Sequence, residues 1–121
     1  MSLRNIFLFL LGVLLLSILL AVTGVAKHYE YVDVPLHILG GFGWAMIAAN
    51  LIVRAKAPSQ PKWFNFLFTV GVVLLVGVLW EFFEFGISHW AGPQTWRDTL
   101  GDLMNDGWGA ILGWYFLVKN K

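Results

Sequence analysis

Four long apolar segments constrain this chain more than any other feature of its sequence. Residues 6–26 contain no charged side chain, and a helix of this length, at about 1.5 Å per residue, crosses a hydrocarbon core of about 30 Å. Residues 34–53, 64–88 and 97–118 form three further runs. Backbone groups inside a bilayer must be hydrogen-bonded within the protein, and barrel strands would be shorter and alternate in polarity. The sequence therefore predicts an all-α membrane protein, with four transmembrane helices in a single domain spanning residues 1–121.

The composition agrees with this class and excludes several others. Hydrophobic residues make up 59% of the chain and charged residues 12%, against roughly 45–50% and 25% in soluble domains. The net charge of +1 creates no field that would attract a polyanion, so no nucleic-acid partner is expected. The absence of cysteine excludes disulfides, thiolate-ligated zinc, iron–sulfur clusters and cysteine nucleophiles.

Basic residues predict the orientation of the four spans, because lysine and arginine are concentrated in cytoplasmic loops. Six of them share the side of both termini and two lie on the other side: Arg4, Arg54, Lys56, Lys62, Lys119 and Lys121 against Lys27 and Arg97. Both termini are therefore expected in the cytoplasm. A cleaved signal peptide, with Gly24-Val25-Ala26 as its cleavage site, is the alternative for the first segment, although its apolar run exceeds the usual length of about 7–15 residues.

The acidic residues and histidines gather at the opposite side from the termini. They lie in the two outer loops or within a few turns of them: Glu30, Asp33, Glu81, Glu84, Asp98, Asp102 and Asp106, with His28, His37 and His89. The rule for lysine and arginine says little about carboxylates, so it does not explain this clustering.

Each of the last three segments carries one stripe that is polar at its outer end and mostly small deeper in. Residues three and four apart share a helix face, and the stripes are Gly77, Glu81, Glu84 and Ser88; Asp98, Asp102, Asn105, Gly109 and Gly113; and His37, Gly41, Trp44 and Ala48. Small residues allow helices to approach closely. Packed together, the stripes would place six polar side chains around one cleft in the outer third of the bilayer: His37, Glu81, Glu84, Asp98, Asp102 and Asn105.

Glu81 and Glu84 are the hardest of these residues to explain structurally. A carboxylate in a bilayer core costs on the order of 2.5–3.5 kcal/mol, so intramembrane acids are functional by default, and a single structural hydrogen bond does not need two acids one turn apart. Asp106 is expected off the stripe, paired with a basic residue. His28 and His89 are loop residues and weak candidates.

Several other members of the stripes have structural alternatives. Asp98 follows Thr95 by three residues, the spacing of a helix-capping box. Asp102 and Asn105 are also explained as hydrogen bonds between helices, and His37 as a packed, hydrogen-bonded histidine.

The residue types indicate acid–base or metal chemistry. The catalytic and metal-ligating candidates are Glu81, Glu84 and Asp102, with His37 as a further metal ligand; the substrate-binding candidates are His37, Arg97 and Asn105. Oxygen ligands favour Mg²⁺, Ca²⁺ or Mn²⁺, while participation by His37 would admit Zn²⁺ or Fe²⁺. A metal-free acid–base pair formed by Glu81 and Glu84 is equally compatible.

Three motifs together resemble one known family. His37 with Gly40-Gly41, the E-x-x-E string at Glu81 and Glu84, and the D-T-x-x-D-L-x-x-N string that begins at Asp98 resemble the VanZ-like group of small bacterial membrane proteins, most closely its YjdF-type branch. Many VanZ-like proteins have an aromatic residue after the histidine and a glutamine at the second acid, where this chain has Ile38 and Glu84. The resemblance implies a multi-pass protein of the bacterial inner membrane and supplies no reaction.

Three functions are compatible with these features. The first is an envelope enzyme or lipid-binding protein, whose cleft takes a membrane lipid or lipid-linked glycan and whose cation binds a phosphate head group or activates water. The second is an accessory subunit of a larger membrane complex. The third is a transporter of protons or cations, which would require a homo-oligomer because one copy offers four thin helices whose inner halves are nearly without polar side chains.

Overall fold

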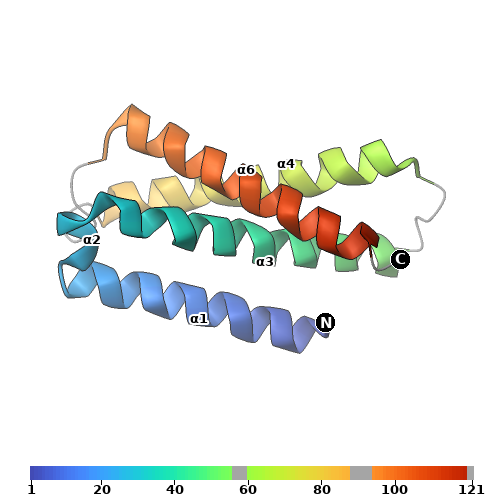
Figure 1. Ribbon diagram of the computed structural model, residues 1–121, viewed down its shortest axis with the longest axis horizontal. Helices are drawn as coiled ribbons and strands as arrows, with labels where there is room; N and C mark the ends of the chain where they lie inside the picture. The colour runs from blue at the N-terminus through green and yellow to red at the C-terminus, as the bar shows by residue number, and fades with distance from the viewer. Residues whose placement is uncertain (56–59, 88–93, 120–121) are drawn as a thin grey trace.

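The computed structural model describes residues 1–55, 60–87 and 94–119, and these residues form helices joined by short turns (Figure 1). The elements are α1 (Leu3–Val22), α2 (Val25–His28), the 3₁₀ helix η1 (Glu30–Val32), α3 (Asp33–Arg54), α4 (Lys62–Gly86) and α6 (Trp96–Lys119). No strand occurs in the described part of the chain, so the predicted all-α class is confirmed.

The four long helices begin and end within a few residues of the predicted segments, with one larger difference. The first was expected to continue to residue 26, but α1 ends at Val22. Thr23 turns its hydroxyl back to the carbonyl oxygen of Leu19 at 2.8 Å, and Gly24 adopts a left-handed conformation with φ of 79°. Glycine has no Cβ penalty there, so the helix stops and the chain turns through α2 and η1 towards α3.

Helix α3 is the centre of the fold. It contacts α1, α4 and α6, while α4 and α6 also contact each other. Figure 1 shows α1 lying along α3 on the side away from α6, and both termini at the end of the molecule where α3 is connected to α4. The opposite end holds the start of α3, the end of α4 and the start of α6, which are the segments that carry the acidic residues.

Small residues set the close approach of α3 and α6. A Cβ added to Gly109 would strike the carbonyl oxygen of Ile38 and lie 2.7 Å from the backbone nitrogen of Phe42. One added to Gly113 would lie 2.6 Å from the Cβ of Ala45. The backbones of the two helices are therefore in contact, as the Gly109-x-x-x-Gly113 spacing predicts.

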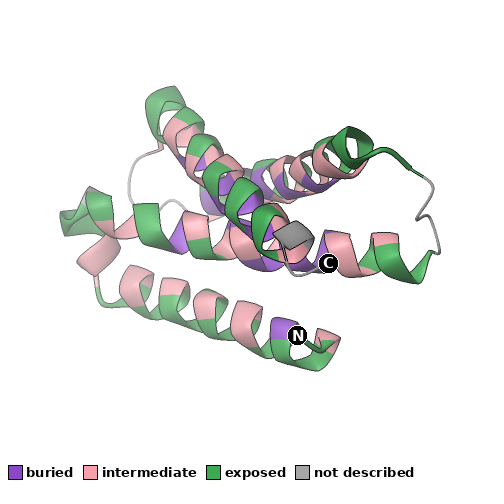
Figure 2. Cartoon of the chain, turned by 45° about the vertical axis from the view of Figure 1, so that its right-hand side comes forward, coloured by how far each residue is buried: buried purple, intermediate pink, exposed green. Residues whose placement is uncertain are grey.

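The surface of the helices suits a lipid surrounding. In Figure 2 the buried residues face the junctions between helices and the exposed ones face outwards, and the exposed set is rich in large apolar side chains such as Leu8, Leu15 and Leu19 of α1. Helices α1, α3 and α4 are long and apolar enough to cross a membrane. Helix α6 is as long, about 36 Å at 1.5 Å per residue, but the first half of this helix carries Arg97, Asp98, Asp102 and Asp106.

Candidate functional site

The acidic cluster, which we define as His37, Glu81, Glu84 and Asp102, lies where the start of α3, the end of α4 and the first half of α6 meet. All four side chains are buried, and each offers one ligand atom such that these atoms lie within 4.8 Å of one another. The i,i+3 spacing of Glu81 and Glu84 places both on the face of α4 that packs against α3 and α6. The convergence expected from the stripes is therefore observed for these four residues.

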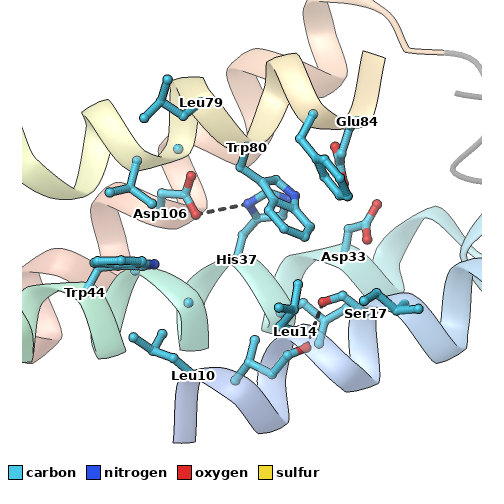
Figure 3. Close-up of a pocket in the computed structure, with 18 of the residues that line it drawn as sticks. Leu10, Leu14, Ser17, Asp33, His37, Trp44, Leu79, Trp80, Glu84 and Asp106 are labelled. Carbon is cyan, nitrogen blue, oxygen red and sulfur yellow. Dashed lines mark hydrogen bonds and ion pairs between the residues drawn. The ribbon is translucent and has the colours of Figure 1, made fainter. Parts of the chain in front are cut away.

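His37 is held between two carboxylates of α6. The Nδ1 atom of His37 lies 3.0 Å from Oδ1 of Asp106, and Nε2 lies 3.5 Å from Oδ2 of Asp102. The hydrogen bond to Asp106, drawn as a dashed line in Figure 3, assigns the proton of a neutral imidazole to Nδ1. In the neutral form the lone pair of Nε2 faces the cluster and is available to a cation, whereas in the protonated form both nitrogens donate to the two carboxylates.

Two buried carboxylate oxygens of the cluster have no hydrogen-bond partner among the described residues. Thr99 donates its hydroxyl proton to Oε2 of Glu81 at 3.0 Å, but Oε1 of Glu81 and Oε2 of Glu84 are buried without a partner. Glu81 is 4% exposed and Glu84 is 8% exposed. Buried polar atoms are nearly always paired, so these oxygens require a proton, a water molecule or a cation.

Asp106 lies beside the predicted stripe and still reaches the site, where His37 is the basic residue that it pairs with. It follows Asp102 by one turn, is 5% exposed, and binds His37 rather than a lysine or arginine. The glycine at position 77 makes room for it, because a Cβ there would strike Oδ2 of Asp106. The i,i+4 spacing from Asp102 was the available signal for Asp106. Thr99, which donates to Glu81, was not singled out from the sequence, although its i,i+3 spacing from Asp102 places it on the same face.

Three other stripe or substrate candidates lie outside the acidic cluster. Asp98 is exposed and forms the capping box, accepting from the backbone nitrogen of Thr95 at 3.0 Å and from its hydroxyl at 2.7 Å. Arg97 is exposed, with its guanidinium 5.5 Å from the ring centre of Trp96. Asn105 is half-buried. His28 is exposed on α2, and His89 lies outside the described residues.

The cluster has an excess of acids over bases. Glu81, Glu84, Asp102 and Asp106 face one histidine, and the described lysines and arginines form no ion pair with them. Like charges in a medium of low polarity must be compensated by protons, by a positively charged side chain or by a bound cation. Arg97, in the first turn of α6, does not provide this compensation, because its guanidinium lies over the Trp96 ring.

A cavity of about 520 Å³ lies beside the cluster, between α1, α3 and α4. Its volume is typical of small-molecule sites. Most of its wall is apolar, contributed by residues such as Leu10, Leu14 and Val73, and the acidic side chains that reach it are Asp33, Glu84 and Asp106. Figure 3 shows Asp33 and Glu84 towards one end of this cavity and Leu10 and Trp44 towards the other.

Together these features define the class of the molecule: a helical membrane protein with a buried histidine–carboxylate cluster near one end of its bundle. The chain belongs to a family described as predicted membrane protein (DUF2238), which it matches over residues 2–121. No curated protein and no solved structure matches it.

Proposed function

We propose that the acidic cluster binds one divalent cation. The observation that carries this proposal is the convergence of one imidazole and three carboxylates within 4.8 Å, with buried oxygens of Glu81 and Glu84 that have no other partner. Carboxylate oxygens at such separations fit around an ion whose ligand bonds are about 2.0–2.6 Å long. A bound ion would supply both the positive charge and the missing partners.

The ligand set favours an ion that accepts both oxygen and nitrogen. Three carboxylates suit Mg²⁺, Ca²⁺ and Mn²⁺, and an imidazole suits Zn²⁺ and Fe²⁺. Mn²⁺ belongs to the first group and tolerates a histidine, so it is the probe of choice. Asp106 would act as a positioning residue, because a carboxylate on the far nitrogen of a ligating histidine fixes its tautomer and orientation.

The cation centre would serve a membrane lipid or lipid-linked glycan at the outer face of the bacterial inner membrane, and the relation to VanZ-like proteins is part of this proposal. The cluster lies near the start of α3 and beside a cavity of ligand size, and the proposed orientation would bring it within reach of head groups. When bound, a divalent cation polarises an oxygen atom or activates a water molecule. Glu81, Glu84 and Asp102 are the residues proposed to carry such chemistry.

A transport path through one chain is less well supported. In the inner halves of the helices, Asn50 donates to the backbone of Met46 at 2.9 Å and Thr69 to that of Asn65 at 2.8 Å. These polar groups satisfy their own helices and do not line a route across the bundle.

Binding of Mn²⁺ to purified, metal-free protein tests the proposal. Free Mn²⁺ has a strong electron paramagnetic resonance signal that bound Mn²⁺ lacks, and we expect a titration to show one saturable site per chain. At 100 times Kd the ion should raise the free energy of unfolding by about 2.7 kcal/mol. The control is Asp98→Asn, which removes an acid outside the cluster and should leave Kd unchanged. Absence of binding, with melting curves indifferent to Mn²⁺, Mg²⁺, Ca²⁺ and Zn²⁺, would contradict it.

The role of Asp106 gives a second expected result. Asp106→Asn keeps an acceptor for Nδ1 of His37 but removes the charge, so Mn²⁺ affinity should fall about 10–100-fold. The free energy of unfolding without the ion separates this role from a structural one. If Asp106 only supported the fold, the variant would unfold more easily while its Mn²⁺ affinity stayed as in the wild type.

A further inference from the structure

We infer that the cavity between α1, α3 and α4 binds an amphiphile whose head group is an ammonium ion and whose hydrocarbon chain runs along α1. This inference specifies the class of lipid in the proposed function. It rests on that function for the cation centre that lies beside the head group. Three observations support it: the polarity of the two ends, the sign of the charges, and the aromatic wall.

The cavity is amphipathic along its length. Asp33 is the first residue of α3 and Glu84 is near the end of α4, so the acidic end lies at the end of the bundle opposite the termini, which the proposed orientation places outside. Leu10 and Trp44 lie more than two turns deeper in α1 and α3, at the apolar end (Figure 3). A lipid in the outer leaflet has the same order, with its head at the surface and its chain towards the middle of the bilayer.

The charges at the acidic end favour a cationic head group over a phosphate. The cavity is lined by Asp33, Glu84 and Asp106, with His37 as the one basic side chain, and no lysine or arginine is among the described residues that line it. Carboxyl groups therefore outnumber basic groups at this end. An added phosphate would be repelled, and an added ammonium would be attracted. The phosphate head group considered from the sequence is therefore the less favourable ligand.

Asp33 provides a carboxylate for this head group. It is half-buried at the start of α3, forms part of the cavity wall and lies outside the acidic cluster, so it is not one of the proposed cation ligands. The indole of Trp80 lies beside Glu84 in Figure 3, and tryptophan faces attract ammonium groups. A carboxylate and an aromatic ring together are a recognised environment for alkylammonium ions.

The experiment compares two amphiphiles with the same ten-carbon chain. Decyltrimethylammonium carrying a terminal bromine should quench tryptophan fluorescence of the protein in detergent in a saturable manner, because Trp44 and Trp80 line the cavity. Unlabelled decyltrimethylammonium should compete at least 10-fold better than decyl phosphate. Equal or better competition by decyl phosphate would overturn the inference.

Two glycines supply matched variants for this experiment. A Cβ at Gly40 or at Gly71 meets no atom within 4 Å, but Gly40 lines the cavity and Gly71 does not. Gly40→Leu should fill the cavity and weaken ammonium binding at least 10-fold, while Gly71→Leu should bind as the wild type does. Asp33→Asn, outside the acidic cluster, should weaken ammonium binding without affecting competition by the uncharged decanol. Identical quenching curves for the wild type and Gly40→Leu would show only partition into detergent and would overturn the inference.

Mn²⁺ binding is measured on the same samples, so that the two proposals fail separately. Normal Mn²⁺ binding without a preference for the ammonium compound would leave the cation centre intact and exclude this lipid class. Saturable, Gly40-dependent binding of the ammonium compound without any Mn²⁺ binding would support the cavity and contradict the cation centre.

Discussion

Glu81→Gln should abolish the response of the protein to Mn²⁺ and at the same time make the ion-free protein as stable as the wild type or more stable. The substitution keeps the shape of the side chain and an oxygen that can accept from Thr99, which donates to Glu81 at 3.0 Å. It removes a charge from a side chain that is 4% exposed. Replacing buried ionic groups is often neutral or stabilising by about 1–4 kcal/mol.

The loss of affinity should be large, because Glu81 is a direct ligand in the proposed centre. Changes in outer-shell partners cost about 10–100-fold, so removal of a ligand charge should cost at least about 100-fold. Asp102→Asn should behave in the same way, since Asp102 is another carboxylate of the same cluster. Mn²⁺ titration gives the affinity, and thermal unfolding in chelator gives the stability of the ion-free protein.

The two measurements together distinguish the alternatives for the glutamates. A purely structural pair would give variants whose ion-free stability changes while the wild type itself shows no Mn²⁺ response. If Glu81→Gln bound Mn²⁺ as tightly as the wild type, the cluster would not be the binding site. Asp98→Asn, at an exposed capping residue, separates a specific loss from a general loss of negative charge.

Most of the fold could be predicted from the long apolar segments of the sequence. Runs of apolar residues predict the four long helices to within a few residues, because only helices satisfy the backbone in lipid. The end of α1 was missed since the run of apolar residues continues past Gly24, where the left-handed conformation stops the helix. The sequence pattern describes polarity, and it does not determine where the backbone turns inside an apolar run.

The candidate site could be predicted only in part. The spacing of Glu81, Glu84 and Asp102 identifies the face of each helix, and the structure brings them together with His37. Asp106 was left out of the predicted site because it follows Asp102 by four residues, about 40° further round the helix at 3.6 residues per turn, and the packing of α6 determines which of such neighbours enters the site. The roles of Glu81, Glu84 and Asp102 as ligands or catalytic groups remain predictions.

Asp98 and Arg97 lie outside the acidic cluster because each makes a contact with a nearby residue in the sequence. Asp98 satisfies the first turn of α6 by pairing with Thr95, and Arg97 lies over a neighbouring indole. Both contacts are made within three residues along the chain, so they form without tertiary packing. The cavity between α1, α3 and α4 had no signal in the sequence, because it results from how the helices are spaced and not from any one residue pattern.

The contact between α3 and α6 provides the largest expected effect on stability. Gly109 and Gly107 lie two residues apart in α6, but a Cβ at Gly109 would strike the backbone of α3 whereas a Cβ at Gly107 meets no atom within 4 Å. Alanine is favoured over glycine in a helix by about 1 kcal/mol. Gly107→Ala should therefore be neutral or stabilising.

Gly109→Ala should lower the free energy of unfolding by about 3 kcal/mol or more, because overpacking costs about 1–3 kcal/mol and backbone atoms cannot move aside as a side chain can. The helices would have to separate, and separation also widens the 3.5 Å contact between His37 and Asp102. Mn²⁺ affinity should consequently fall in Gly109→Ala and stay unchanged in Gly107→Ala. Reversible unfolding in a denaturing detergent measures the stability. Equal stability of the two variants would mean that α3 and α6 are not in backbone contact, and the acidic cluster, which depends on that contact for its His37–Asp102 pair, would then have a different geometry.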